Sequence, residues 1–270
     1  MFGMVPASYP HKASSTRPIR LPPVKITVVI PTFNEAANLP KLVGSLYALA
    51  IPSLHILVVD DDSPDGTGDL ADQFITEFTG RFSVIHRSGK QGLGTAYIAG
   101  FQRALLEGAE VVIQMDADFS HPPEKLPELI NTLKNCDMVL GSRYVTGGAV
   151  DERWPFWRRS LSAFGNWYAR AVLRFPVRDA TGGYRVWRRE TLLGMPLEAV
   201  KSNGYAFQVE MAYIAYKLGY TIREVPFYFA DRQWGTSKMS FAIQREAAFR
   251  VWGILFEYRH LQRMVSELPQ

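Results

Sequence analysis

The sequence predicts an α/β protein with a doubly wound, mostly parallel sheet, flanking helices and a C-terminal helical elaboration. Short apolar runs rich in β-branched residues alternate with helical patterns at the spacing of right-handed βαβ units. Acidic and other polar residues directly follow several of these runs. The chain has 270 residues, of which 47% are hydrophobic and 21% charged, and this composition is typical of a globular core rather than of a disordered chain.

The alternation starts with the run KITVVI, which is typical of a strand buried on both faces of a parallel sheet. Asn34 is a candidate N-cap for the helix that follows this strand. In chain order, the expected strands are 25–30, 54–59, 82–86, 111–115 and 137–141, and the expected helices between them are 35–50, 66–78, 95–106 and 124–134.

The regular alternation of expected strands and helices ends after residue 141. A glycine-rich loop at 145–150 precedes an aromatic and basic helix at 156–175. Further helices are expected at 207–218 and 241–264, with a strand candidate at 221–229 between them.

Composition divides the chain into three parts. Residues 1–23 contain five prolines and no apolar periodicity, so we expect a flexible arm. Residues 24–240 hold the α/β domain, and residues 241–270 hold an amphipathic helix. No linker rich in Gly, Ser or Pro interrupts the chain after residue 24, so we expect one domain with a C-terminal elaboration.

Charge, cysteine content and hydropathy exclude several classes of protein. The net charge of +4, from 30 basic and 26 acidic residues, is too small to indicate a nucleic-acid partner, although it suits phosphate-rich partners. The single cysteine, Cys136, excludes an intrachain disulfide framework, and the five histidines lack the spacing of a metal pair. No apolar run approaches the ~18–20 residues of a membrane span, and no signal peptide is evident. The sequence predicts a soluble, cytoplasmic protein.

Unusual polar residues follow four of the expected strands. Because ligands of open α/β sheets bind outside the carboxyl ends of the strands, we expect these segments to converge on one rim. The segments are PTFNE (31–35), DDDSPDG (60–66), DADFSHPP (116–123) and GSRY (141–144).

Three consecutive aspartates after the second strand repel one another unless they have partners. The sequence S-P-D-G also favours a solvated turn, which is the plainer interpretation of Asp62 and Asp65. Asp61 is the better candidate for a functional residue, because a carboxylate at this place can accept hydrogen bonds from a ribose or a base.

Asp116 and Asp118 form the sharper motif. A spacing of two places both carboxylates on one side of a locally extended chain, where they can hold Mg²⁺ or Mn²⁺ and leave positions for phosphate oxygens and water. Such pairs are common by chance, but this one directly follows a buried strand and lies beside a second acidic strand end. A response-regulator receiver also gathers acids at strand ends, but that fold is roughly half as long as this chain, within the ~100–150-residue domain norm.

Gly92 and Gly94, in GKQGLGTAY, do not complete a dinucleotide fingerprint, because the third glycine is missing. We interpret them as glycines that permit the backbone to approach a sugar nucleotide closely, and the alternative is an ordinary turn.

The blocks VVIPTFNEAANL, VVDDDSPDGT, GKQGLGTAYIAGF, MDADFSHPPE, GSRYV and GYAFQVEM together resemble the polyprenol-phosphate (dolichyl-phosphate) mannose synthases, which are inverting GT-A glycosyltransferases. The resemblance covers about residues 24–240 and depends on the order of the blocks. It implies a GT-A domain, GDP-mannose as the donor, a divalent cation, and a polyprenyl phosphate acceptor that becomes polyprenyl-phosphate mannose.

The resemblance also implies roles for individual residues. Two positions depart from the family: Phe33 stands where Tyr is frequent, and Ser120 stands where some members have a Gln metal ligand. The implied nucleotide-pocket residues are Pro31, Phe33, Glu35, Val59, Asp61 and Ala117; the implied metal residues are Asp116, Asp118 and Ser120; and the implied catalytic residues are Asp118, Arg143, Arg232 and Lys238, of which the three cations match family positions that contact phosphates.

Three further residues are placed with the substrate. Arg159 precedes SLSAFGN, in which Ala163 replaces a basic residue that is frequent in the family. Asp179 and Arg185 flank the family block T-G-G-Y, and we expect them near the active site; the alternative is a buried Asp–Arg pair that only supports the fold.

The implied mechanism follows from charge. A nucleoside diphosphate becomes a good leaving group when a metal and cationic side chains neutralise its developing charge. The acceptor phosphate is already anionic and needs no general base, so we expect catalysis by positioning and electrostatics, with inversion at the anomeric carbon.

The expected helices at 156–175 and 241–264 mix aromatic with basic residues. Such helices can lie in a bilayer interface, but helices that pack on a core or on a partner subunit share the pattern. Family members have C-terminal spans, partner membrane subunits or neither. We expect a peripheral protein at the cytoplasmic face of the membrane.

Two alternative functions stay open on the sequence. One is transfer of glucose or another hexose from a UDP-sugar to a polyprenyl phosphate or other lipid. The other is a non-catalytic module that binds sugar nucleotides or membrane surfaces. The acids Asp61, Asp116 and Asp118 argue against the second, because a dead site has no need to hold uncompensated charge.

Overall fold

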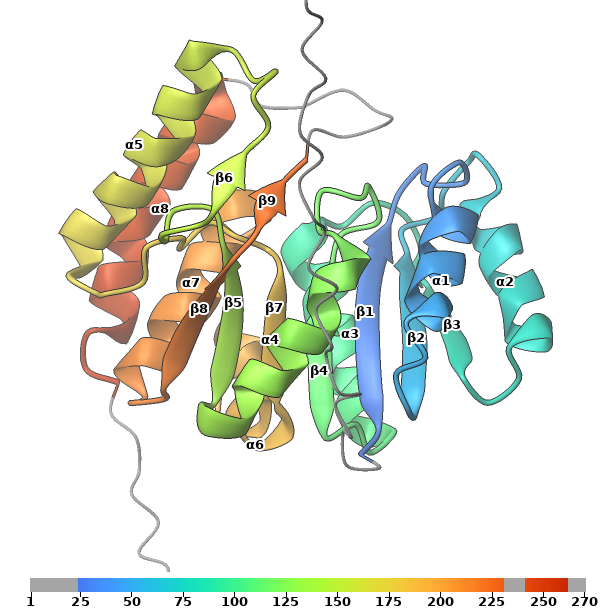
Figure 1. Ribbon diagram of the computed structural model, residues 1–270. Coiled ribbons are helices and arrows are strands. Elements are labelled where there is room, and N and C mark those ends of the chain that lie inside the picture. Colours follow the sequence, from blue (N-terminus) through green and yellow to red (C-terminus); the bar gives the residue numbers. More distant parts are fainter. Residues whose placement is uncertain (1–23, 231–240, 262–270) are drawn as a thin grey trace, which may run out of the picture.

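The computed structural model describes residues 24–230 and 241–261, with the side chains of 241–247 excepted. A central seven-stranded sheet has the order β3-β2-β1-β4-β7-β5-β8, and a small second sheet pairs β6 with β9 (Figure 1). The strands are β1 (Ile26–Thr32), β2 (Leu54–Asp60), β3 (Phe82–His86), β4 (Val111–Gln114), β5 (Met138–Ser142), β6 (Ala149–Val150), β7 (Arg185–Arg188), β8 (Ile222–Pro226) and β9 (Tyr228–Phe229).

Helices cover both faces of the sheet and divide the core into two clusters (Figure 1). One cluster lies under α3 and α7 and includes Phe101, Trp187 and Phe207. The other lies under α1 and α4 and includes Leu39 and Leu126. The helices are α1 (Leu39–Ala48), α2 (Thr67–Glu77), α3 (Leu93–Leu106), α4 (Leu126–Thr132), α5 (Phe156–Leu173), α6 (Arg189–Leu193), α7 (Gly204–Lys217) and α8 (Phe241–Tyr258), with short 3-10 helices at Pro123–Lys125, Leu133–Asn135 and Leu197–Ala199.

The five strands predicted in the first half are confirmed to within two residues at each end. Every residue of β2 is buried, as expected for an apolar run with helices on both faces of a parallel sheet. The predicted parallel pairing is also confirmed, since β1 pairs in parallel with both β2 and β4.

The start of the first helix was predicted wrongly. α1 begins at Leu39, and Asn34 is not its N-cap but has a positive φ of 63°. The backbone N–H groups of residues 34–36 are engaged elsewhere: Asn34 donates to Ser63 Oγ, and Ala36 donates to Asp65 Oδ2, both at 3.0 Å. The loop after β2 therefore holds this segment out of the helix.

The sequence did not predict β7. This strand runs antiparallel between β4 and β5, so the sheet is mixed. Its four residues, RVWR, are too short and too strongly charged at both ends to stand out as an apolar run. Because β7 lies between them, β4 and β5 and the loops that follow them are one strand further apart than simple alternation suggests.

The C-terminal helix α8 packs on the body of the protein. Val251, Ile254 and Tyr258 are buried in the same cluster as residues of α5 and α7. Over the described residues, no helix is both long and apolar enough to cross a membrane. The predicted arm at 1–23 and the end of the predicted last helix lie outside the described residues.

Candidate active site

Loops that follow β1, β2, β4 and β5 meet at one edge of the sheet, which is the upper edge in Figure 1. The first two loops are tied together at the ends of their strands. Thr32 Oγ1 donates to Asp60 Oδ1 at 2.9 Å, and the N–H of Asp61 donates to the carbonyl of Thr32 at 3.1 Å. The rim expected from the sequence is therefore present.

The acidic loop after β2 contains two kinds of carboxylate. Asp60 and Asp65 organise the loop itself, because they accept hydrogen bonds from Ser63 and Thr67 respectively. Asp61 instead is 5% exposed and lies 3.1 Å from a guanidinium nitrogen of Arg87. Burial raises the pKa of Asp61 above its ordinary value, and the Arg87 charge opposes that shift. Asp61 therefore pairs with a cation and does not stabilise the turn in the way that Asp60 and Asp65 do.

Most of the residues expected around the nucleotide lie in or just after the ends of β1 and β2. Pro31, the second-last residue of β1, is partly exposed, as is Phe33. The Nζ of Lys90 lies 4.2 Å from the centre of the Phe33 ring, a cation–π distance. Glu35 accepts a hydrogen bond of 2.7 Å from Asn38 Nδ2. Val59 lies in the core and is 0% exposed, so only its backbone can face a ligand.

The loop after β4 carries the pair Asp116 and Asp118. Asp116 is partly exposed, and its Oδ1 accepts a hydrogen bond of 2.6 Å from the hydroxyl of Tyr97. Asp118 is 6% exposed, and its Oδ1 accepts the N–H of Ser120 at 3.0 Å. Ala117, between the two acids, is buried. Tyr97 of α3 therefore holds the Asp116 carboxylate, and the local turn holds the Asp118 carboxylate.

These residues fit a divalent cation. The hydroxyl of Ser120 is buried and has no hydrogen-bond partner among the described residues, although its backbone N–H is paired with Asp118. Hard oxygen donors of this kind suit Mg²⁺ or Mn²⁺. Among residues 24–230 and 241–261, no cluster of three or more His, Cys, Asp or Glu side chains can hold a metal by itself. A cation at this loop would take its remaining ligands from a bound phosphate or from water.

Sequence reasoning missed His121, since it found no role for any histidine. The side chain is 1% exposed, its Nδ1 accepts the N–H of Asp116 at 3.0 Å, and its ring stacks on Tyr184 at 4.9 Å. Burial lowers the pKa of His121, although Asp116 and Asp118 oppose this, so the neutral ring carries its proton on Nε2. The only sequence signal was its position directly after Ser120 in the acidic block. His121 therefore holds the start of the loop after β4 through the backbone N–H of Asp116.

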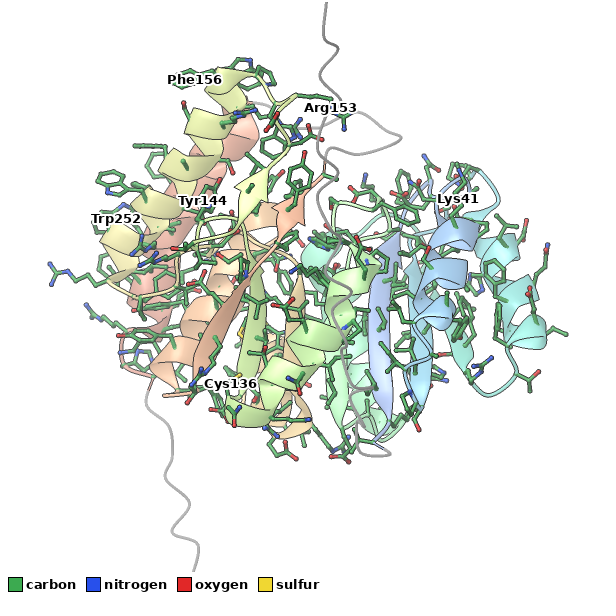
Figure 2. The ribbon with its side chains drawn as sticks, in the orientation of Figure 1. Lys41, Cys136, Tyr144, Arg153, Phe156 and Trp252 are labelled. Carbon is green, nitrogen blue, oxygen red and sulfur yellow. The ribbon has the colours of Figure 1, made fainter. Side chains whose placement is uncertain are left out.

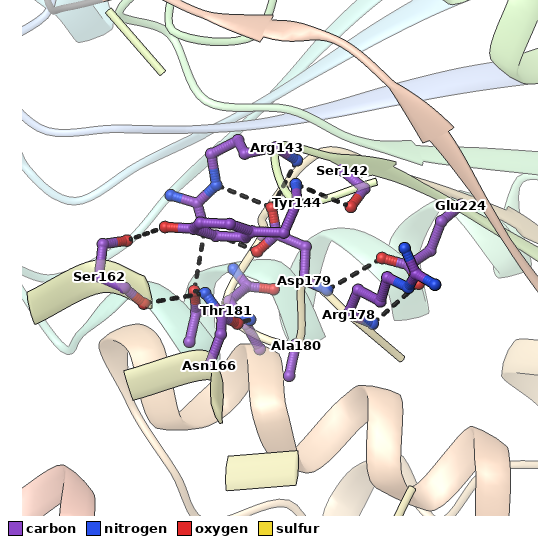
Figure 3. A network of polar contacts seen from close by, with 12 residues as sticks. Ser142, Arg143, Tyr144, Ser162, Asn166, Arg178, Asp179, Ala180, Thr181 and Glu224 are labelled. Carbon is purple, nitrogen blue, oxygen red and sulfur yellow. Dashed lines mark hydrogen bonds and ion pairs between the residues drawn. The ribbon is translucent and has the colours of Figure 1, made fainter. Parts of the chain in front are cut away.

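Arg143, after β5, forms the centre of a buried polar network (Figure 3). Its Nε and Nη2 donate to Asp179 Oδ2 and Oδ1 at 2.8 and 2.6 Å, and Nη2 also donates to Thr181 Oγ1. Burial alone would lower the pKa of Arg143, but the Asp179 carboxylate raises it above the ordinary value. The backbone N–H of Asp179 is held in turn by Glu224 at 2.9 Å. The Asp–Arg pair weighed from the sequence exists, with Arg143 and not Arg185 as the partner.

The other predicted cations have different surroundings. Arg185 is 0% exposed and donates to the carbonyls of Gly182, Ala180 and Gln208, and burial lowers its pKa to about 9. Arg159 donates to the carbonyls of Asp151 and Glu152. Arg232 and Lys238 lie outside the described residues.

Aromatic side chains stand exposed along α5 and α8, on the side of the protein where Figure 2 labels Trp252. A groove of about 530 Å³ between the two helices is lined by Trp167, Val172, Arg174, Trp252 and Leu255, among others. We name five of the exposed rings of these helices the aromatic face: Phe164, Trp167, Phe249, Trp252 and Phe256.

Comparison with known proteins agrees with this architecture. Residues 27–193 match the family model described as Glycosyl transferase family 2. The chain is 47% identical over 236 residues to the polyprenol monophosphomannose synthase of Mycolicibacterium smegmatis, covering 86% of this chain and 88% of that protein. It is 44% identical over 241 residues to the undecaprenyl-phosphate mannosyltransferase of Micrococcus luteus, covering 88% of this chain and 98% of that protein.

Among solved structures, glucosyl-3-phosphoglycerate synthase from Mycobacterium tuberculosis in complex with Mn²⁺, uridine diphosphate and phosphoglyceric acid has a TM-score of 0.62 to this chain. The match covers 88% of this chain and 79% of that one at 18% identity, and therefore shows the fold alone. The resemblance to the polyprenol-phosphate mannose synthases is confirmed by the sequence relatives. The chain belongs to glycosyl transferase family 2 and is a glycosyltransferase with the GT-A fold.

Proposed function

We propose that this enzyme transfers mannose from GDP-mannose to a polyprenyl phosphate with inversion, giving polyprenyl-phosphate mannose and GDP. One observation carries the proposal: the acids Asp61, Asp116 and Asp118 share a rim in a chain that matches two enzymes named for this kind of transfer over nearly their whole length. A non-catalytic module would have no reason to keep partly desolvated carboxylates at that rim.

The donor nucleotide would lie over the ends of β1 and β2. Phe33 and Lys90 form a flat, cationic surface against which a base can stack, and the Asp61 carboxylate can accept hydrogen bonds from a ribose or base. Arg87 would favour the charged form of Asp61, because its guanidinium opposes the rise in pKa that burial causes.

Asp116 and Asp118 would hold Mg²⁺ or Mn²⁺ between the rim and the donor diphosphate, with the unpaired hydroxyl of Ser120 as a further oxygen donor. When bound, the cation supplies charge neutralisation of the leaving diphosphate. The protein would hold both carboxylates in place before the donor binds, through the hydrogen bonds from the Tyr97 hydroxyl to Asp116 and from the N–H of Ser120 to Asp118.

In the transfer itself, an oxygen of the acceptor phosphate attacks the anomeric carbon while the bond to the GDP oxygen breaks on the opposite side. The acceptor is already an anion, so no proton has to be removed. Arg143 stays paired with Asp179, and its guanidinium carbon lies 5.3 Å from the centre of the Tyr144 ring. Arg232 and Lys238 are proposed to contact the phosphates, as the family resemblance implies.

The acceptor is a lipid, and the aromatic face is proposed to rest on the cytoplasmic surface of the membrane. Exposed rings favour the headgroup boundary, and Arg174, which lines the groove, would add attraction to anionic lipid. A membrane partner subunit that covers the same rings is the alternative occupant. The inner side of α8 is already packed on the core, so only its outer side is available.

The test is an assay with labelled GDP-mannose and a short polyprenyl phosphate in the presence of Mg²⁺ or Mn²⁺. We expect polyprenyl-phosphate mannose as the product, with loss of activity when EDTA is added. UDP-glucose in the same assay is the control donor. Preferential transfer from UDP-glucose would contradict the donor assignment, and no transfer from any sugar nucleotide would contradict the enzyme function.

A further inference from the structure

Two sequence motifs far apart in the chain, GKQGLGTAY and GYAFQVEM, pack against each other in the structure. A Cβ atom at Gly94 would lie 2.5 Å from the carbonyl oxygen of Ser202 and 2.9 Å from the ring of Phe207. A Cβ atom at Gly92 would lie 2.7 Å from Asn203 Oδ1. The glycines therefore let the start of α3 approach the start of α7 more closely than any other residue would allow.

This close approach places Tyr97 between α7 and the acidic loop after β4. The Tyr97 ring is 0% exposed and lies parallel to the Phe207 ring, with centroids 5.9 Å apart and an interplanar angle of 4°. Its hydroxyl donates to Asp116 Oδ1 at 2.6 Å. Since the ring is stacked and enclosed, the hydroxyl has one position from which to donate.

Asp116 has few other constraints. Within residues 24–230 and 241–261, the Tyr97 hydroxyl makes the one recorded hydrogen bond to the Asp116 carboxylate, and the backbone N–H of Asp116 donates to His121. A short hydrogen bond from a fixed donor stops the carboxylate from rotating, so the second oxygen is directed away from Tyr97.

The support behind Tyr97 reaches the C-terminal helix. Phe207 is one turn from Glu210, which is 0% exposed and accepts hydrogen bonds from Ser202 N, Arg250 Nη2 and Tyr258 Oη at 2.9, 3.1 and 2.8 Å. Arg250 and Tyr258 belong to α8. The loop before α7, α7 itself and α8 are thus joined at one buried carboxylate, which keeps the Phe207 ring in place.

We propose that Tyr97 is a positioning residue that orients the Asp116 carboxylate for the divalent cation and the donor diphosphate. This inference rests on the proposed metal-dependent transfer. It accounts for both motifs: the glycines admit the contact, and α7 supplies the ring that holds Tyr97.

The decisive variant is Tyr97→Phe, which keeps the stacked ring and removes only the hydroxyl. We expect the affinity for Mn²⁺ in the presence of GDP, measured by electron paramagnetic resonance, to fall about 10- to 100-fold, the usual effect of losing a partner of a metal ligand. The Mn²⁺ concentration for half-maximal transfer should rise in parallel, and excess Mn²⁺ should restore much of the rate. Tyr213→Phe, a buried tyrosine of α7 that contacts Phe175, is the matched control and should change neither value.

Unchanged Mn²⁺ affinity in folded Tyr97→Phe would overturn the proposal. If Tyr97→Phe does not fold, Phe207→Leu serves instead, because it keeps the hydroxyl and removes the stacked ring; it should also weaken Mn²⁺ binding, and unaltered binding would overturn the proposal. A wild-type protein that binds Mn²⁺ and GDP but transfers no mannose would contradict the proposed function and leave the Mn²⁺ measurement on Tyr97 valid.

Discussion

Arg143 and Asp179 form a two-pronged ion pair in which both side chains are almost completely buried. Removing one partner from such a pair leaves an uncompensated buried charge. We therefore expect Asp179→Asn to lower the free energy of unfolding by about 3–5 kcal/mol, measured by urea denaturation. The control Asp69→Asn, at an exposed position of α2, should stay within about 0.5 kcal/mol of wild type. Equal stabilities of the two variants would show that the pair does not support the fold.

Asp116→Asn and Asp118→Asn should each abolish metal-dependent transfer while the protein stays folded. Losing a carboxylate that holds the cation costs several kcal/mol of barrier, which corresponds to a rate loss of at least about 100-fold. Initial rates at saturating GDP-mannose give the measurement, and circular dichroism checks the fold. Glu124→Gln, an exposed acid just beyond the same loop, is the control. Near-normal turnover of either aspartate variant would remove that residue from the metal site.

Asp61→Ala should weaken the binding of GDP even without a sugar attached. Loss of a charged hydrogen-bond acceptor costs about 1.5–3 kcal/mol, so titration calorimetry should show a roughly 10- to 100-fold higher Kd. Asp61→Asn also loses the charge that pairs with Arg87 but keeps the shape and an acceptor oxygen, so comparing it with Asp61→Ala separates the effect of the charge from that of the side chain. Asp62→Asn, at the exposed neighbour, should bind GDP normally. If Asp61→Ala also binds GDP normally, Asp61 does not belong to the nucleotide site.

The double variant Phe249→Ser, Phe256→Ser tests the aromatic face. These rings are 72% and 57% exposed and contribute little to the core, so the variant should stay folded. Burying a Phe ring in an interface stabilises binding by about 1.5–3 kcal/mol, so co-sedimentation with anionic vesicles should fall at least about 10-fold. Transfer to a long, membrane-embedded acceptor should fall more than transfer to a short, water-soluble one.

The control for this face is Leu106→Ser, at an 85% exposed residue at the end of α3. Deleting the chain from Phe241 onward is a poor alternative, because it would also remove Arg250 and Tyr258 from Glu210. Equal losses on the long and the short acceptor would indicate that the aromatic face binds something other than the membrane.

Acidification should destabilise the protein below about pH 6.5. Burial is the main cause that lowers the pKa of both His55 and His121 from an ordinary value near 6.5. The unfolded chain therefore binds protons below pH 6.5 that the folded chain does not, and the free energy of unfolding falls by up to about 1.4 kcal/mol per pH unit for each histidine. Stability is at its full value above pH 6.5 and is lost as the pH falls through the two folded-state values. Tm measured from pH 7.5 to 5.5 should decline less steeply in His55→Gln, and a flat wild-type profile would contradict the prediction.

Much of the fold could be predicted from the sequence because the first half of the chain follows one local rule, in which an apolar strand is followed by a helix. β1 pairs with β2 and β2 pairs with β3, in each case the next strand along the chain, while β4 returns to pair with β1. The rule fails at β7, whose place depends on pairing with strands more than forty residues earlier. No local pattern in RVWR specifies that pairing.

The same distinction holds for the candidate site: some of its residues follow from local sequence patterns, and others depend on tertiary packing. Acidic strand ends such as Asp116 and Asp118 were identified because their position follows from the direction of parallel strands. Sequence did not indicate that Asp179 pairs with Arg143 or that Tyr97 donates to Asp116, because those contacts depend on tertiary packing. His121 was overlooked because a histidine that accepts a backbone N–H has no spacing signature.

The order in which the chain is synthesised differs from the order in which its central strands lie. β3, β2, β1 and β4 come from one continuous stretch, so this part of the sheet can form while the ribosome is still adding residues. Within the part of the chain that the structure describes, β5 by contrast pairs only with β7 and β8, which emerge later. Until Arg185–Arg188 is made, β5 is an apolar strand without its β7 neighbour. We expect this interval to be the stage at which nascent chains depend most on chaperones, because unpaired apolar strands favour aggregation.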